Sequence, residues 1–125
     1  MNVPEDRHYT DQHEWVMATN GGVRIGITDY AQDALGDVVF INLPEKGREV
    51  VTDETIAEIE STKSVSEIYA PLAGTITEVN SALADAPELI NSDPYAAAWL
   101  CLIAPTDQPA LEQLLDAAGY RALTE

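Results

Sequence analysis

Short runs of apolar residues, several of them alternating with polar ones, are separated by turn residues over the first hundred positions. This pattern is typical of β-strands. Two runs, 14–19 and 23–27, flank Asn20, Gly21 and Gly22, and Asn and Gly supply the positive φ angles that a tight hairpin needs. Further strand-like runs follow at 38–43, 55–60, 65–70, 75–80 and 99–103. The sequence therefore predicts a mainly β chain.

Two segments have the pattern of helices instead. Thr28 is a suitable N-cap for a short helix over 29–35, and Gly36 can end it in a left-handed conformation. Near the end of the chain, candidate cap Asp107 precedes leucines at helical spacing, and Gly119 follows them. The apolar positions of this segment are Leu111, Leu114, Leu115 and Ala118. We expect a short helix in the N-terminal half and a C-terminal helix packed on the sheet.

A faint repeat indicates how the strands are grouped. Residues 44–47 and 71–74 both read PxxG, and each copy precedes a strand-like run. They lie on either side of a central hairpin formed by 55–60 and 65–70, which suggests two half-sheets with each glycine turning a corner. No linker or block of charge divides the chain. We predict a single domain over residues 1–125.

The net charge of the chain limits the kinds of partner that it can bind. The 125 residues include 22 Asp and Glu against 6 Lys and Arg, a net charge of −16 at pH 7. Such a surface repels phosphate backbones and anionic lipid headgroups, so we expect neither nucleic-acid binding nor membrane association. Because 46% of the residues are hydrophobic, the acidity does not indicate disorder.

The location of the protein is predicted from its cysteine and its N-terminus. Cys101 is the only cysteine and lies in the apolar run 99–104, where it can act as a small hydrophobe. A lone thiol suits a reducing compartment. Residues 1–8 have no apolar segment flanked by basic residues, and the longest apolar stretch, 95–104, is too short to span a membrane. We therefore expect a cytoplasmic protein.

Lys63 is the most informative residue. The chain has only two lysines, Lys46 and Lys63, and Lys63 lies at the tip of the predicted central hairpin between Ser61, Thr62 and Ser64. These small neighbours leave its amine accessible. An exposed lysine has a pKa of about 10.4, so an enzyme that acylates it must first remove a proton. The alternative interpretation is ordinary surface charge in a turn.

Four separated blocks of sequence resemble a known family. The chain reads HYTDQHEWV from His8, GITDYAQDALGDVVFINLPEKG from Gly26, ESTKSVSEIYAPLAG from Glu60 and INSDPY from Ile90. In this order they resemble the lipoyl-carrying H proteins of the glycine cleavage system. The resemblance implies a flattened antiparallel barrel-sandwich hybrid of two half-sheets, like lipoyl and biotinyl domains, with the modified lysine on an exposed hairpin.

The resemblance also assigns site residues. Lys63 matches the family's lipoylated lysine, and Glu60 and Gly74 match positions involved in recognition by lipoate-attaching enzymes. It implies that the arm folds into a cleft near the HEW segment, which makes Glu14 our candidate partner for the cargo amine and Glu67 a second carboxylate. Biotinyl domains place methionines on both sides of their lysine. The neighbours here are threonine and serine, so biotin is disfavoured.

The function that the resemblance implies is that of a non-catalytic carrier. Its cofactor would be (R)-lipoate, covalently attached to Lys63. It would carry the aminomethyl group of glycine from a pyridoxal-phosphate glycine decarboxylase (P protein) to a tetrahydrofolate-dependent aminomethyltransferase (T protein). Dihydrolipoamide dehydrogenase (L protein) and a lipoate-attaching enzyme would be further partners. A carboxylate near the cargo would keep its amine protonated and so suppress loss of the carbon as formaldehyde.

Three other interpretations remain open at this point. The chain could be a lipoyl relay that donates lipoyl groups to carriers of 2-oxoacid dehydrogenases. A hydrolase using His13 and Glu14 would need further polar groups, which the sequence does not indicate. A metal site formed by His8, His13 and Glu14 is disfavoured because a spacing of five suits neither a helical nor a strand face. Isolated surface histidines, or stacking beside Trp15, fit that spacing better.

Overall fold

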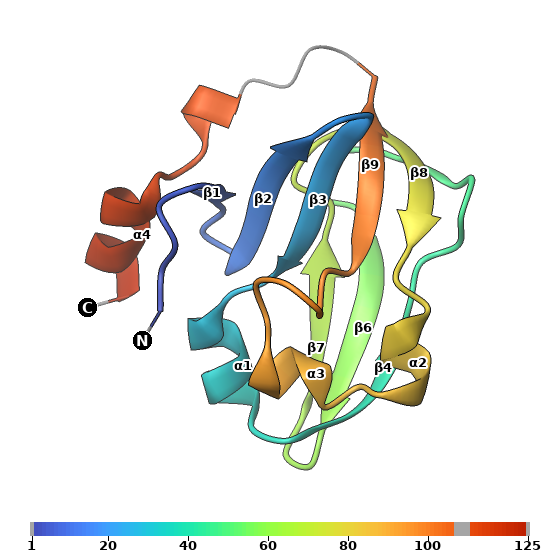
Figure 1. The fold of residues 1–125 in the computed structure, drawn as a ribbon, viewed down its shortest axis with the longest axis vertical. Helices are drawn as coiled ribbons and strands as arrows, with labels where there is room; N and C mark the ends of the chain where they lie inside the picture. Colours follow the sequence, from blue (N-terminus) through green and yellow to red (C-terminus); the bar gives the residue numbers. More distant parts are fainter. Residues whose placement is uncertain (1, 107–110, 125) are drawn as a thin grey trace.

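Two antiparallel β-sheets form the body of the computed structural model, which describes residues 2–106 and 111–124 (Figure 1). The larger sheet has six strands in the order β1-β2-β3-β9-β8-β5, and the smaller has three in the order β4-β6-β7. Their bounds are β1 (His8–Tyr9), β2 (Glu14–Thr19), β3 (Gly22–Ile27), β4 (Val38–Asn42), β5 (Glu49–Val50), β6 (Thr55–Ser61), β7 (Val65–Tyr69), β8 (Gly74–Val79) and β9 (Cys101–Pro105). The expected mainly β architecture of two sheets is confirmed.

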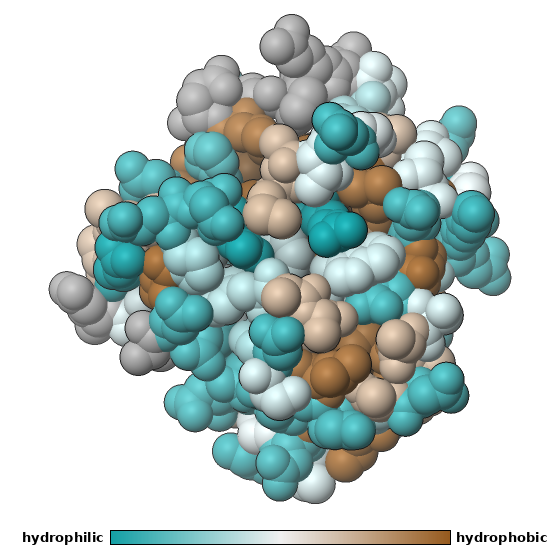
Figure 2. Space-filling model, viewed as in Figure 1, coloured by the Kyte–Doolittle hydropathy of each residue, from teal (hydrophilic) through white to brown (hydrophobic). Residues whose placement is uncertain are grey.

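The core lies between the two sheets. Strand residues alternate between the two faces of a sheet, and the inward-facing ones here are predominantly branched aliphatic residues. Completely buried side chains come from both sheets, among them Ile25, Ile59, Ile76 and Ile103. A second cluster, rich in aromatic residues, contains Tyr9, Trp15, Tyr95 and Tyr120, and so joins the start of the chain to its C-terminal segment. Hydrophilic residues cover most of the face seen in Figure 2, where apolar residues form separate areas.

The predicted hairpin and first helix are confirmed. Strands β2 and β3 pair in register from Glu14 with Ile27 to Thr19 with Gly22. Helix α1 (Asp29–Leu35) begins after Thr28, whose hydroxyl accepts a hydrogen bond from the amide of Ala31 at 3.2 Å. It ends at Gly36, whose φ of 79° is one that residues other than glycine rarely adopt.

The two PxxG copies come together in the larger sheet. The first copy precedes β5 and the second ends at Gly74, the first residue of β8, and these two strands pair with Val50 opposite Gly74. The expectation that the copies mark two half-sheets, with a glycine turning a corner in each, is therefore wrong. Gly47 turns the chain with a φ of 92°. Gly74 is needed for packing, because a Cβ atom there would lie 2.3 Å from the carbonyl oxygen of Ala104. The two sheets are unequal, since β1, β2 and β3 extend the larger one.

The segment between β8 and β9 is more regular than its prolines suggest. It contains two single-turn helices, α2 (Ala82–Asp85) and α3 (Leu89–Ser92). Strand β9 begins at Cys101, two residues later than expected. The side-chain amide of Asn80 donates to the carbonyls of Ala97 and Trp99, each at 2.8 Å, and so holds the backbone before the strand.

The expected helix over positions 111–118 is wrong. Leu111–Gln113 form a single 3-10 turn, η1, and the C-terminal helix α4 spans Ala117–Thr124. Gly119 lies inside this helix instead of ending it. The expected cap, Asp107, lies outside the described residues. Helix α4 does pack on the sheet, next to β1 at its edge (Figure 1).

Tertiary hydrogen bonds explain this difference. The backbone of Leu115 exchanges two hydrogen bonds with Tyr9, at 2.8 and 2.9 Å, which holds the chain extended where the spacing of apolar residues predicts a helix. Asp116 then follows, and its carboxylate accepts a hydrogen bond from the amide of Gly119 at 2.8 Å. This is an N-cap contact, so the helix starts after Asp116. None of the helices in the described part of the chain is long and apolar enough to cross a membrane.

Candidate functional site

Lys63 lies at the exposed tip of the β6–β7 hairpin, as predicted. Ser61 holds the turn: its amide donates to the carbonyl of Ser64 at 2.8 Å, and its hydroxyl accepts from the amides of Lys63 and Ser64, each at 3.1 Å. A serine hydroxyl that bonds nearby backbone amides fixes a turn without using the other side chains. The backbone of the tip is therefore ordered while the side chain of Lys63 faces solvent.

The tip also rests against the end of α1. The amide of Thr62 donates to the carbonyl of Asp37 at 3.0 Å. A Cβ atom at Gly36 would lie 2.7 Å from Cε of Lys63, so the glycine leaves room for the stem of this side chain. The sequence predicts Gly36 only as a helix end, and its contact with Lys63 becomes visible only in the fold.

Glu14 is buried at the start of β2, with 1% of its surface exposed. One carboxylate oxygen accepts from the hydroxyl of Thr10 at 3.0 Å, and the other from the amide of Tyr69 at 2.8 Å. Burial raises the pKa of Glu14 to about 7. The two hydrogen bonds oppose this shift, whereas the negative charges of Asp53 and Asp11 add to it.

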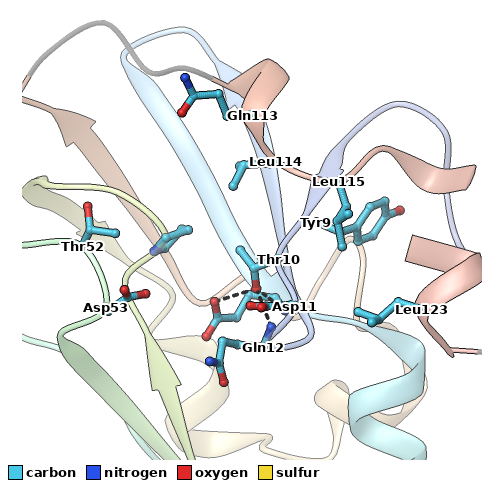
Figure 3. A pocket seen from close by; sticks show the side chains of 12 residues that line it. Tyr9, Thr10, Asp11, Gln12, Thr52, Asp53, Gln113, Leu114, Leu115 and Leu123 are labelled. Carbon is cyan, nitrogen blue, oxygen red and sulfur yellow. Dashed lines mark hydrogen bonds between the residues drawn. The ribbon is translucent and has the colours of Figure 1, made fainter. Parts of the chain in front are cut away.

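A cavity of about 430 Å³ opens beside Glu14 and is referred to below as the acidic pocket (Figure 3). Its lining combines carboxylates with leucines from the C-terminal segment. These residues are Asp11, Glu14, Asp53, Leu114, Leu115 and Leu123. Figure 3 shows Asp53 on one side of the pocket and Leu115 and Leu123 on the other. A site of this composition suits a cation attached to an apolar body.

A second cavity, of about 280 Å³, lies between α1 and β7 and is referred to as the hairpin groove. It begins at Ser64, next to Lys63, and Val65 and Ile68 continue along it from the hairpin side. From the opposite side Ala31, Ala34 and Leu35 of α1 line it. Gln12 lines both the hairpin groove and the acidic pocket, so the two cavities adjoin at this residue. No pattern in the sequence points to Gln12.

The structure separates the remaining predicted site residues. Glu67 is exposed on β7, accepts a hydrogen bond from the hydroxyl of Tyr69 at 3.1 Å, and lines neither the groove nor the acidic pocket. Glu60 is exposed on β6 opposite Val65. Gly74 lies in the other sheet, in close contact with β9. Their parts in recognition and in binding the arm stay predictions.

His13 and Cys101 are accounted for by packing. His13 contacts the hydroxyl of Tyr120 through Nδ1 at 2.7 Å, and its ring lies 4.6 Å from that of Tyr30 instead of beside Trp15. Among the described residues no group of three potential ligands could hold a metal ion. Cys101 is buried, and this burial raises the pKa of its thiol to about 12.

Comparisons with known proteins agree with this geometry. The sequence model of the family described as "Glycine cleavage H-protein" matches residues 7–125. The glycine cleavage system H protein of Thermus thermophilus is 53% identical over 125 residues, which are 100% of this chain and 98% of that protein. That of Mycobacterium avium is 53% identical over 130 residues, covering 99% of this chain and 98% of the relative.

A solved structure shows the same fold. The crystal structure of a glycine cleavage system H protein from Mycobacterium marinum matches with a TM-score of 0.88 and 46% sequence identity, over 98% of each chain. Sequence similarity over the full length of the chain and a shared fold together establish that these proteins are related. The chain therefore belongs to the glycine cleavage H-protein family.

Proposed function

We propose that this carrier component of the glycine cleavage system bears (R)-lipoate on Lys63 and has no catalytic turnover of its own. The observation that carries the proposal is the position of Lys63. It lies on an ordered, exposed turn, next to a groove that adjoins the pocket of Glu14. A carrier needs both features, because its arm must reach other proteins and must also find shelter on its own surface.

Attachment requires a free amine and an activated acyl donor. An ATP-dependent lipoate-attaching enzyme would present an acyl adenylate. Nζ of Lys63, once deprotonated, would form the amide bond while the bond to the adenylate breaks and AMP leaves. The ordered turn around Ser61 presents the lysine in one place.

The groove is suited to an apolar arm. Its walls include Ile27, Leu35, Val65 and Ile68, and the α1 side carries the small residues Ala31 and Ala34. An alkyl chain that enters it removes apolar surface from water, which is favourable by about 25 cal/mol per Å². Lipoate, when bound, supplies a disulfide that can accept both a carbon group and electrons.

Glu14 is our proposed partner for the amine of the aminomethyl cargo. Burial disfavours its charged form, so its pKa is about 7. An ammonium group in the acidic pocket would offset this cost and favour the carboxylate, and the carboxylate in turn would favour the ammonium. The protonated amine cannot expel a thiolate, so the cargo is protected from loss as formaldehyde. Asp11 and Asp53 add negative potential to the same pocket.

The partners proposed for the carrier are the P, T and L proteins and a lipoate-attaching enzyme. A net charge of −16 favours partners with basic surfaces, because attraction between opposite charges speeds association. Salt screens this attraction and therefore slows association. Attachment of lipoate removes the positive charge of Lys63 and makes the chain still more acidic. Association rates that do not change with salt would contradict this part of the proposal.

Intact-mass spectrometry after incubation with a lipoate-attaching enzyme, ATP and lipoate tests the attachment site. The wild-type chain is expected to gain one lipoyl mass, and Lys63→Ala none. Lys46→Ala is the matched control, since Lys46 is the other lysine and is also exposed. An equal gain by Lys63→Ala would show that the site is wrong.

Reconstitution with the P protein then tests the carrier role. Lipoylated chain is expected to support exchange of bicarbonate into glycine, whereas lipoylation without exchange would indicate a relay. Incubation of the carrier with glycine and the P protein also tests Glu14. We expect Glu14→Gln to accept lipoate normally and to release formaldehyde faster. An unchanged rate of release would remove Glu14 from the protecting role.

A further inference from the structure

We propose that the outer face of the three-stranded sheet, beside the hairpin tip, is the docking surface for the lipoate-attaching enzyme. The surface is centred on three residues that lie side by side across the sheet, Phe40 on β4, Glu60 on β6 and Val65 on β7. They are referred to as the Phe40 row. The proposal rests on the attachment of lipoate to Lys63 proposed above.

All three side chains of the row face solvent. Phe40 is 52% exposed and Val65 58%, and Glu60 between them is also exposed. Residues directly opposite each other on neighbouring strands point to the same face of a sheet. The row is therefore a continuous apolar–acidic–apolar strip, and it begins two residues from Lys63 in the sequence.

A β-bulge places Phe40 on this face. Val38 lies opposite Ser61 but Phe40 lies opposite Glu60, so Val39 is an extra residue in β4. Val38 and Ile41 are both buried. Without the bulge, regular alternation would turn Phe40 to the same side as Val38, into the core. The bulge instead brings the largest apolar side chain of the strand beside the acidic residue nearest the tip.

Exposed apolar side chains are concentrated near this place. Single exposed apolar residues are normal, but neighbouring ones mark interaction sites. Among the described residues, the large hydrophobic side chains that are exposed to solvent are Val39, Phe40, Val51, Val65 and Leu123. Val39 and Phe40 on β4 and Val65 on β7 lie close to the hairpin tip.

The charges around the row define the chemistry of the partner. Glu58 lies two positions from Glu60 on the same face of β6, with Glu67 opposite it on β7. None of the ion pairs in the described part of the chain includes Glu58, Glu60 or Glu67. A complementary surface would hold an apolar pocket for Phe40 and Val65 with Arg or Lys side chains around it.

The short side chain of an unmodified lysine indicates which partner must bind this surface. The enzyme that acylates Nζ must bring its active site to the hairpin tip itself, since the lysine side chain is short. Its contact surface must then cover the residues next to the tip, which include the Phe40 row. Enzymes that react with the cargo meet the end of a much longer arm, so they need not contact the row.

Initial rates of lipoylation test the proposal, with purified unmodified chain, a lipoate–protein ligase, ATP and lipoate. Phe40→Ser is expected to lower kcat/KM about tenfold through a higher KM, and Val65→Ser severalfold. Val51→Ser is the matched control, because Val51 is 64% exposed but lies outside the sheet face. Thermal melts establish that each variant is folded, and Phe40→Leu, which keeps an apolar group, is expected to react at nearly the wild-type rate.

A binding measurement separates docking from chemistry. Lys63→Ala cannot be acylated at this site, so it is expected to inhibit the ligase by competing with wild-type chain. Adding Phe40→Ser to Lys63→Ala should raise the inhibition constant about tenfold. Wild-type kcat/KM for both Phe40→Ser and Val65→Ser, with no change in the inhibition constant, would overturn the docking surface alone. Failure of the wild-type chain to gain lipoate on Lys63 would overturn the proposed function, and the docking surface with it.

Discussion

Gly36, which ends α1, lies directly against the side chain of Lys63: a Cβ atom at position 36 would come within 2.7 Å of Lys63 Cε. The contact joins the end of one element to the tip of another. It shows that a residue which ends the helix through its backbone conformation also borders the space taken by the side chain of Lys63.

We predict that Gly36→Ala slows lipoylation of Lys63 severalfold. The positive φ of 79° should also cost about 1–2 kcal/mol of stability. Gly47→Ala is the matched control, because Gly47 has a φ of 92° and nothing within 4 Å of a Cβ atom. Both variants should lose stability in urea unfolding, and only Gly36→Ala should be lipoylated more slowly. Equal lipoylation rates would show that Lys63 simply moves aside.

We predict that Glu14 makes the protein less stable as the pH rises from about 4.5 to about 7. Its pKa is raised from 4.5 to about 7 by burial, so in this range the folded state binds more protons than the unfolded state. Above pH 7 this loss of stability is complete, and it is on the order of 3 kcal/mol.

Urea unfolding of wild type and Glu14→Gln at several pH values measures this effect. Titrating groups that do not interact with Glu14 contribute equally to both chains, so the difference between the two free energies of unfolding reports Glu14 together with its coupling to Asp11 and Asp53. Relative to wild type, Glu14→Gln should gain stability as the pH rises through the window and then stay constant. Parallel pH profiles would contradict a raised pKa.

Gly74→Ala should act through packing and not through recognition. A Cβ atom would lie 2.3 Å from the carbonyl oxygen of Ala104, and backbone on a neighbouring strand cannot move aside easily. We expect a loss of at least about 2 kcal/mol in urea unfolding. The fraction that remains folded at low temperature should be lipoylated at the wild-type rate. A slower rate for folded Gly74→Ala would support the recognition role that the resemblance implies.

Local patterns predicted the elements that depend on local chemistry. The β2–β3 hairpin follows from Asn and Gly in its turn, and α1 from Thr28 and Gly36, because each of these signals acts within a few residues. Lys63 could be found because its hairpin is local and the chain has so few lysines. The resemblance in sequence supplied the chemistry that we propose for it.

Contacts between distant segments could not be predicted in the same way. The leucine spacing near the C-terminus favours a helix, but the backbone of Leu115 pairs with Tyr9, more than a hundred positions away. Burial of Glu14 likewise depends on Tyr69, whose amide reaches it from the other sheet. The bulge at Val39 has no local signal, since an unbroken apolar run is compatible with either register.

Tyr120→Phe tests whether the C-terminal helix is fixed to the body of the protein by its polar contacts. The hydroxyl of Tyr120 lies 2.7 Å from Nδ1 of His13 and 2.7 Å from the hydroxyl of Thr28, and the ring stacks on Tyr9 at 4.8 Å. Removal of the hydroxyl keeps the stacking but takes one hydrogen-bond partner from the buried hydroxyl of Thr28 and one from the half-buried ring of His13, so we expect a loss of about 1–2 kcal/mol in urea unfolding. Tyr69→Phe, which removes only an exposed hydrogen bond to Glu67, should change stability by less than about 0.5 kcal/mol. Equal stability of wild type and Tyr120→Phe would mean that the hydroxyl of Tyr120 is not needed to hold α4 in place.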